Sequence, residues 1–265
     1  MQGQKKLSFS ALALSVWTAA LAESLEPGVS LRGMLLYGGL GALLLTGISA
    51  VLYVCWQQTA VRQVWLFAAI LGLLAEAFRT AMQAQSVCRQ EFHSMALLGL
   101  LPLLLWVGCR IPLSGWDAPA RVLWWFVLLG EGLCLAGIAG QMEWSHLLEP
   151  DAVQLARLPR VPLYAEYLLW PLLIEEPAPR RVLFLPWLTF FAQVCLAGGI
   201  CLVFGGTDYP EQELLRVWSV GIFSRMDALL LLIWLTCAVF RIGFLCAAAG
   251  ELWEKAANRR KGAAG

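Results

Sequence analysis

Ionisable side chains inside apolar stretches are the residues of this chain with the clearest capacity for chemistry. Glu131 stands near the middle of the stretch Val122–Gly140, among glycines that permit close helix approach: Gly130, Gly132, Gly137 and Gly140. A carboxylate in hydrocarbon is costly unless it is paired, so it marks either a functional site or an ion pair. Two interpretations of Glu131 stay open: a partner for a ligand ammonium or a proton, and a structural pair with an arginine from another helix.

Glu166 lies in the weakest apolar stretch, Val161–Ile174, which contains Pro162 and Pro171. This stretch is too short and too interrupted for a continuous helix across about 30 Å of hydrocarbon. A broken span is tolerated where it lines a cavity, and the N-terminus of a half-helix there binds carboxylates. We expect Glu166 and the adjacent Ala165 to contact a ligand, with a simple helix cap as the alternative.

The first apolar stretch, Leu7–Ala22, is also short for a membrane span and runs out at Glu23. Segments one and six are related positions in transporters built from inverted repeats of five helices, where broken helices surround the substrate. Ser15 and Thr18 supply hydroxyl groups in the first stretch. We expect them to accompany Glu166 at a ligand site between the two breaks.

The remaining charged residues in apolar stretches favour structural roles. Glu76 and Arg79 are three residues apart on one helix face, a spacing that allows them to pair with each other. Arg241 follows Asp227 by fourteen residues, roughly 21 Å along a helix, so it needs another partner or reaches toward the cytoplasm. Asp227, close to Arg225, is predicted to cap the N-terminus of the last helix.

Composition indicates that these stretches cross a lipid bilayer. Of the 265 residues, 60% are apolar and 14% are charged, and the mean hydropathy is +0.70. A soluble domain has roughly 25% charged residues. The apolar runs lack the alternation of strands, so helices are expected. A net charge of +1 offers nothing for nucleic acid to bind.

Neither a cofactor nor an enzymatic centre is expected. The 8 cysteines include no CxxC pair, only 2 histidines are present, and buried cysteine commonly acts as a small apolar residue. The sequence contains no nucleophile elbow, no metal-ligand spacing and no paired His, Asp and Glu cluster. We therefore expect a membrane protein that is not an enzyme and holds no metal.

Eight stretches are predicted to be helices of one integral membrane domain, residues 1–265: Leu7–Ala22, Gly33–Trp56, Val64–Ala84, Met95–Cys109, Val122–Gly140, Val161–Ile174, Val182–Gly206 and Ala228–Gly250. Lys5 and Lys6 precede the first stretch, and Arg259, Arg260 and Lys261 follow the last. Positive charge favours the cytoplasmic side, so both termini are expected there and the number of crossings must be even. The architecture expected is therefore all-α and polytopic, with about eight spans.

The C-terminal stretch Tyr209–Glu254 resembles the permease-like B subunits of bacterial spore germinant receptors. The family pattern is an aromatic–proline pair, an amphipathic stretch, a phenylalanine–x–arginine turn, then acidic–alanine–leucine and a tryptophan. The matching residues are Tyr209, Pro210, Phe223, Arg225, Asp227, Ala228, Leu229 and Trp234. YAEYLLWPLL at Tyr164–Leu173 is similar to the glycine–x–glutamate segment that leads to a proline, and Phe78–Gln85 is similar to the arginine-bearing third helix.

The resemblance implies a fold and a function. The family belongs to the amino-acid/polyamine/organocation transporter superfamily, whose fold is two inverted repeats of five helices. The implied division is a first repeat at residues 1–140 and an incomplete second repeat at 141–265, a truncated five-plus-three version. The expected function is recognition of a small nutrient, an amino acid, during spore germination, in the spore inner membrane and with other receptor subunits as partners. The alternative is a degenerate membrane scaffold or assembly subunit that binds no ligand.

Overall fold

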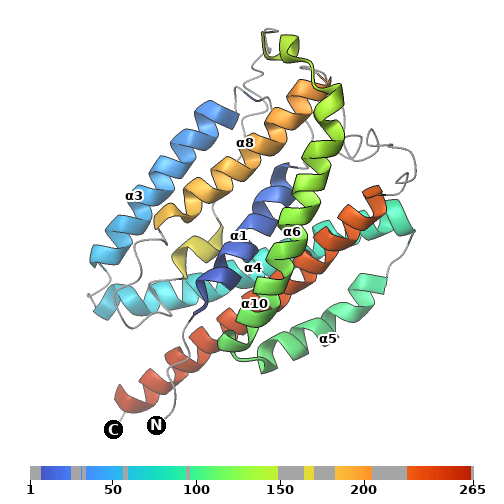
Figure 1. Cartoon of the computed structure of the whole chain (residues 1–265). Coiled ribbons are helices and arrows are strands. Elements are labelled where there is room, and N and C mark those ends of the chain that lie inside the picture. The colour runs from blue at the N-terminus through green and yellow to red at the C-terminus, as the bar shows by residue number, and fades with distance from the viewer. Residues whose placement is uncertain are drawn as a thin grey trace.

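The chain is helical throughout the part that its computed structural model describes. The described residues are 7–24, 31, 34–55, 59–93, 96–148, 164–169, 183–204 and 226–263, and no strand occurs among them. The principal α-helices are α1 (Phe9–Ser24), α3 (Gly39–Cys55), α4 (Thr59–Phe92), α5 (Ala96–Arg110), α6 (Asp117–Ile138), α8 (Leu185–Phe204) and α10 (Met226–Ala263). Figure 1 shows them as one bundle in which α1 begins and α10 ends at the same end. The prediction of an all-α architecture is confirmed.

Short helical segments extend or join the long helices. The π-helical turn η1 (Met34–Gly38) leads into α3, and the 3₁₀ turn η2 (Leu113–Trp116) leads from α5 into α6. Two further 3₁₀ turns, η3 (Ala139–Gln141) and η4 (Trp144–Leu148), follow α6. A separate 3₁₀ turn, η6 (Ala165–Leu168), represents the predicted sixth stretch, of which the structure describes residues 164–169.

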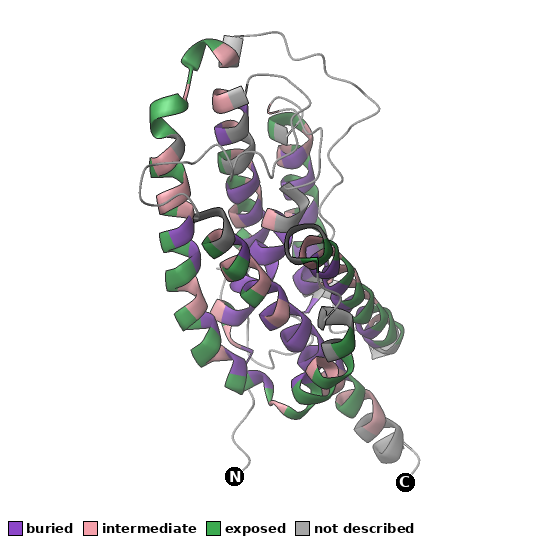
Figure 2. Ribbon diagram, turned by 90° about the vertical axis from the view of Figure 1, so that its right-hand side faces the viewer, coloured by how far each residue is buried: buried purple, intermediate pink, exposed green. Residues whose placement is uncertain are grey.

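Helix α1 forms the centre of the bundle. Every residue from 11 to 20 is buried, and the helix contacts α6, α8, α10 and η6. A helix that is apolar all round must be covered on every side, which explains this central position. Figure 2 shows the buried residues gathered in the middle of the bundle, with exposed residues along its outer faces.

Helices α4 and α10 form an extensive helix pair, and both are longer than the apolar stretches that predicted them. They have 34 and 38 residues, against the predicted stretches Val64–Ala84 and Ala228–Gly250. Their backbone hydrogen bonding continues through polar and charged ends such as the terminal turns of α10. Hydropathy marks only the apolar part of a helix, so it underestimated the length of both.

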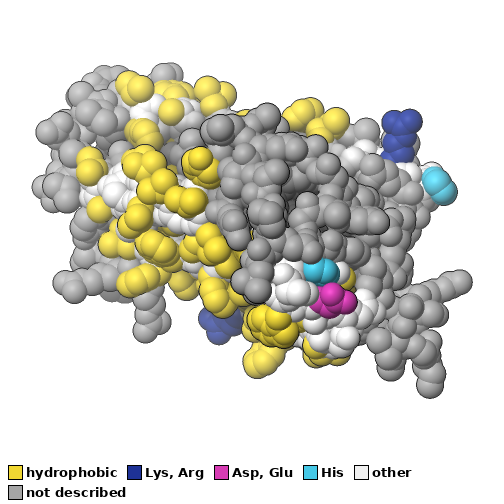
Figure 3. All heavy atoms as spheres, turned by 90° about the horizontal axis from the view of Figure 1, so that it is seen from above, with side chains coloured by type: hydrophobic (Ala, Val, Ile, Leu, Met, Phe, Trp, Pro, Cys, Tyr) yellow, Lys and Arg dark blue, Asp and Glu magenta, His cyan; other side chains and the backbone are white. Residues whose placement is uncertain are grey.

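Within the described ranges, three helical segments are long and apolar enough to cross a membrane: Val64–Arg89, Leu113–Gln141 and Leu229–Ala257. Shorter apolar helices occur at Phe9–Leu21, Leu35–Val51 and Leu185–Cys195. Large apolar side chains are exposed along α3 and α6, among them Leu44, Val51, Trp125 and Leu129. Figure 3, which views the molecule from above, shows hydrophobic side chains gathered over part of the described surface. Such faces require an apolar surrounding, so these helices indicate a membrane protein.

Glycines bring α5 and α10 into close contact. A Cβ atom on Gly108 would lie 3.0 Å from both the Cα and the carbonyl oxygen of Gly243. On its own side, a Cβ atom on Gly243 would lie 2.2 Å from the Trp116 ring, which packs edge-on against Phe240. Small residues permit this backbone approach, as they commonly do between membrane helices.

The variant Gly243→Ala is expected to destabilise the folded protein by about 1–3 kcal/mol, because its methyl group overlaps the Trp116 ring. Gly250→Ala is the matched control on the same helix, because a Cβ atom there meets nothing within 4 Å. Thermal melting of the two purified variants in detergent measures the difference. Equal melting midpoints would contradict the close packing of α10 on Trp116.

Candidate functional site

The guanidinium of Arg241, on α10, lies at the centre of a buried polar cluster. The residue is 1% exposed. Its Nε donates to Oε1 of Glu166 at 2.8 Å, and one terminal nitrogen donates to Oε2 of Glu76 at 3.1 Å. Its other terminal nitrogen donates to the Thr80 hydroxyl, which itself donates to the backbone carbonyl of Glu76. Arg241 therefore has the partners that its position in an apolar stretch demands.

Glu166 enters this cluster from the turn η6. Ser15 on α1 donates to the same carboxylate oxygen as Arg241, Oε1, at 2.9 Å. The second oxygen, Oε2, is buried and has no hydrogen-bond partner in the part of the chain that the structure describes. We call Ser15, Glu76, Thr80, Glu166 and Arg241 the Arg241 cluster. Its chemically distinctive feature is this buried acceptor oxygen, which is adjacent to the central helix α1.

Two tyrosines flank Glu166 and fix the turn against α8. The Arg241 guanidinium carbon lies 5.8 Å from the centroid of the Tyr164 ring, and the rings of Tyr164 and Tyr167 are 5.5 Å apart. The Tyr167 hydroxyl hydrogen-bonds to that of Thr189 at 2.6 Å, and Gln193 donates to the Tyr164 hydroxyl at 3.5 Å. The turn therefore has aromatic and polar anchors despite containing only four residues.

Glu76 links the cluster to a less buried arginine. The Arg79 guanidinium lies 3.8 Å from Oε1 of Glu76, the i,i+3 contact that the spacing predicted. The side chains of Arg79 and Glu76 are 36% and 12% exposed, respectively. With Arg241 and Glu166, the region contains two guanidinium groups and two carboxylates, whose formal charges cancel when all are ionised.

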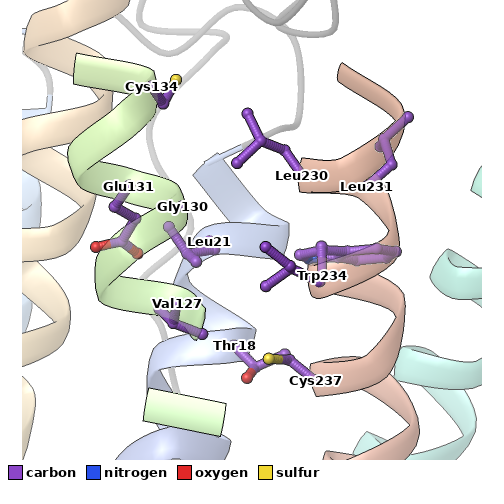
Figure 4. A pocket seen from close by; sticks show the side chains of 11 residues that line it. Thr18, Leu21, Val127, Gly130, Glu131, Cys134, Leu230, Leu231, Trp234 and Cys237 are labelled. Carbon is purple, nitrogen blue, oxygen red and sulfur yellow. The ribbon is translucent and has the colours of Figure 1, made fainter. Parts of the chain in front are cut away.

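Glu131 occupies a second polar position, on the other side of α1. Its Oε1 accepts a hydrogen bond from the Trp17 indole nitrogen at 2.5 Å. A neutral donor from α1 thus contacts Glu131, in place of the arginine that one of its two interpretations required. Glu131 and Thr18 also line a cavity of about 120 Å³ between α1, α6 and α10, drawn in Figure 4.

The predicted ligand residues fall into two groups rather than one. Ser15 and Glu166 meet in the Arg241 cluster, and a Cβ on Gly72 would lie 3.4 Å from the methyl group of the adjacent Ala165. Thr18 and Glu131 meet at the cavity. Of the residues expected to be structural, three meet at the Arg241 cluster and its edge: Glu76, Arg79 and Arg241.

The family-motif residues are only partly placed. Trp234 lines the cavity, and Asp227 lies in the first turn of α10, where its predicted capping role falls outside the described side chains. Arg225 lies outside the described residues, as do three other residues of the resemblance: Tyr209, Pro210 and Phe223. Among the described residues, no group of three or more His, Cys, Asp or Glu side chains is placed to hold a metal ion.

Sequence reasoning missed Thr80, Trp17 and the two tyrosines as members of these sites. Thr80 lies four residues after Glu76, so helical spacing alone places it on the same face. Tyr164 and Tyr167 flank Glu166 in the sequence, a local signal that was available. No local sequence signal pointed to Trp17, because its contact with Glu131 spans 114 residues of sequence.

Replacing Arg241 by methionine is expected to destabilise the protein by about 3–5 kcal/mol, because two buried carboxylates lose their cation. Arg121→Met serves as control. Arg121 pairs with Asp117 on the surface with its side chain 71% exposed, and such pairs contribute about 0–1 kcal/mol. Thermal melting in detergent measures both variants. If Arg241→Met lowers the melting temperature no more than the control does, the role of Arg241 as the centre of the cluster is contradicted.

Comparison with known proteins finds no family model, no characterised protein and no solved structure that matches this chain.

Proposed function

We propose that this chain is a permease-like membrane subunit that recognises a small nutrient, an amino acid, in spore germination. The observation that carries the proposal is the buried Oε2 atom of Glu166, which has no hydrogen-bond partner among the described residues and belongs to a carboxylate held against α1 by Ser15. A buried acceptor of this kind costs free energy until a donor arrives. The ammonium group of an amino acid is a hydrogen-bond donor whose positive charge is opposite to that of the carboxylate.

The surroundings of Glu166 favour recognition of a zwitterion over a simple cation. The Glu166 carboxylate binds the ammonium, while Arg241 keeps the carboxylate oriented through its 2.8 Å hydrogen bond to Oε1. The sequence predicts a helix break in the stretch Val161–Ile174, and the backbone groups that such a break frees bind a carboxylate. Recognition then uses both charged ends of the amino acid.

The proposed membrane arrangement is about eight crossings, a truncated five-plus-three form of the inverted-repeat transporter fold, with both termini cytoplasmic. Two features support it. The apolar stretches that predicted helices coincide with described helices, apart from the sixth, of which only η6 is described. The start of α1 and the end of α10 lie at the same end of the bundle, as an even number of crossings requires (Figure 1).

The proposed mechanism is a shift between two states of the bundle. Ligand contacts Glu166 at the interface of η6 with α1 and α4, so it alters the packing of these elements. A ligand changes a conformational equilibrium only by its difference in affinity for the two states. Other receptor subunits in the membrane then sense the state that ligand favours. Transport of the ligand is not required for this signal.

A second candidate function is a membrane scaffold or assembly subunit that binds no ligand. The observation that favours it is the charge balance of the Arg241 cluster with Arg79, in which two carboxylates already face two guanidinium groups. A balanced buried network can act purely as a structural connection between helices. Under this alternative, Glu166 positions η6 and meets no ligand.

The two functions predict different results when purified protein is melted in the presence of amino acids, sugars and nucleosides. Recognition predicts a selective rise in melting temperature for one amino acid. Ligand at about 100 times its dissociation constant stabilises the folded state by about 2.7 kcal/mol. Glu166→Gln is expected to abolish this rise. Glu143→Gln, on a side chain 68% exposed and distant in sequence, should retain it.

Each variant is compared with its own ligand-free melting midpoint, which separates lost binding from lost stability. Ser15→Ala gives a second measurement without removing a charge, and it should weaken the ligand response by releasing one contact to Oε1. The scaffold function would be favoured if none of the tested ligands raised the melting temperature of folded protein that still associates with membrane partners. An unchanged ligand response in Glu166→Gln would contradict the proposed site.

A further inference from the structure

The cavity between α1, α6 and α10 is separate from the Arg241 cluster. Its volume is about 120 Å³, and none of the five cluster residues lines it. Its walls come from α1 (Thr18 and Leu21), from α6 (among others Glu131 and Cys134) and from α10 (among others Trp234 and Cys237). Figure 4 shows Leu21 between Gly130 and Leu230, so all three helices contribute side chains to the same space.

The lining is almost entirely apolar, and its polar groups are unevenly paired. Thr18 donates to the Leu14 carbonyl, and the Thr18 and Cys237 side chains meet at the lower end of the cavity in Figure 4. Glu131 already accepts the hydrogen bond of Trp17. The Trp234 indole nitrogen, in contrast, is buried, and no described residue supplies an acceptor for it. A buried N–H group without an acceptor is uncommon and calls for a partner.

We propose that this cavity binds a small uncharged molecule that is apolar over most of its surface and has one hydrogen-bond acceptor for the Trp234 indole. The volume sets the size, because an apolar cavity of about 150 Å³ in another protein binds benzene. A ring of five carbons therefore suits the present cavity. The Glu131 carboxyl group points away from the cavity in Figure 4, so the walls that face a ligand are apolar and do not repay the desolvation of an ammonium or a carboxylate.

The bilayer supplies such a molecule directly. The α6 and α10 residues of the lining lie within the candidate spans Leu113–Gln141 and Leu229–Ala257. Apolar molecules partition into hydrocarbon, so their local concentration beside these helices is high. The ligand proposed for the cavity is uncharged, whereas the group proposed to bind Glu166 is charged. The test of the cavity therefore does not depend on the proposed nutrient.

Two cysteines make occupancy measurable in the full chain reconstituted in lipid nanodiscs. Cys134 lines the cavity and is partly exposed, whereas Cys109 lies outside it, exposed on α5. Both are treated with a small membrane-permeant methanethiosulfonate, and modification at each is followed by mass spectrometry. The probes are cyclopentanone, which has an acceptor oxygen, and cyclopentane, which has none.

Cyclopentanone at ten times its dissociation constant is expected to slow modification of Cys134 about tenfold and to leave Cys109 unchanged, because occupancy reduces the open fraction in that proportion. Cyclopentane should protect Cys134 only at higher concentration. In Trp234→Phe, which keeps an aromatic ring but loses the N–H, the two probes should become equivalent. Leu21→Phe fills the cavity from α1 and should remove protection by both.

Three results would overturn the proposal. The first is equal slowing at Cys134 and Cys109, which indicates a general effect of the probes on the bilayer. The second is a Cys134 that reacts readily yet is protected by neither probe up to its solubility limit. The third is a preference for cyclopentanone that persists unchanged in Trp234→Phe, because the acceptor would then contact another group. Melting of each variant without probe verifies that the bundle is intact.

Discussion

The buried guanidinium of Arg241 is the constraint on which the rest of the structure depends. A cation in an apolar interior costs several kcal/mol unless carboxylates surround it at hydrogen-bonding distance. Glu76 on α4 and Glu166 in η6 supply that charge, at 3.1 Å and 2.8 Å. The three groups come from segments far apart in the sequence. Their pairing therefore fixes how α4, α10 and η6 are placed relative to one another, and it holds a carboxylate beside α1.

Helix α1 connects the two polar regions of the bundle. Ser15 contacts Glu166 on one side, whereas Trp17 contacts Glu131 and Thr18 lines the cavity on the other. Because the helix is buried over residues 11 to 20, it has little room to move independently of its neighbours. Binding at either region changes contacts of the same helix. This shared element gives a physical route by which a small ligand alters the packing of the whole bundle.

The sequence allowed the helices to be predicted because long apolar runs leave few alternatives to helix in a bilayer. The Glu76–Arg79 contact was also predictable, because it depends only on helical spacing. The partner of Arg241 was not predictable, because Glu166 lies 75 residues away and its approach depends on tertiary packing. For Glu131 the sequence left open a ligand or proton partner and an arginine from another helix. The structure shows the donor Trp17, since a neutral donor also satisfies a buried carboxyl group. Both differences come from contacts that one sequence does not encode locally.

The proposed binding of an amino-acid ammonium group by Glu166 can be observed in a structure of the full chain in lipid nanodiscs with the amino acid that raises its melting temperature. The ligand nitrogen is expected at about 3 Å from Oε2 of Glu166, with the contact between Oε1 and Arg241 retained. An amino acid bound elsewhere, with no contact between its ammonium group and Glu166, would contradict the proposed binding.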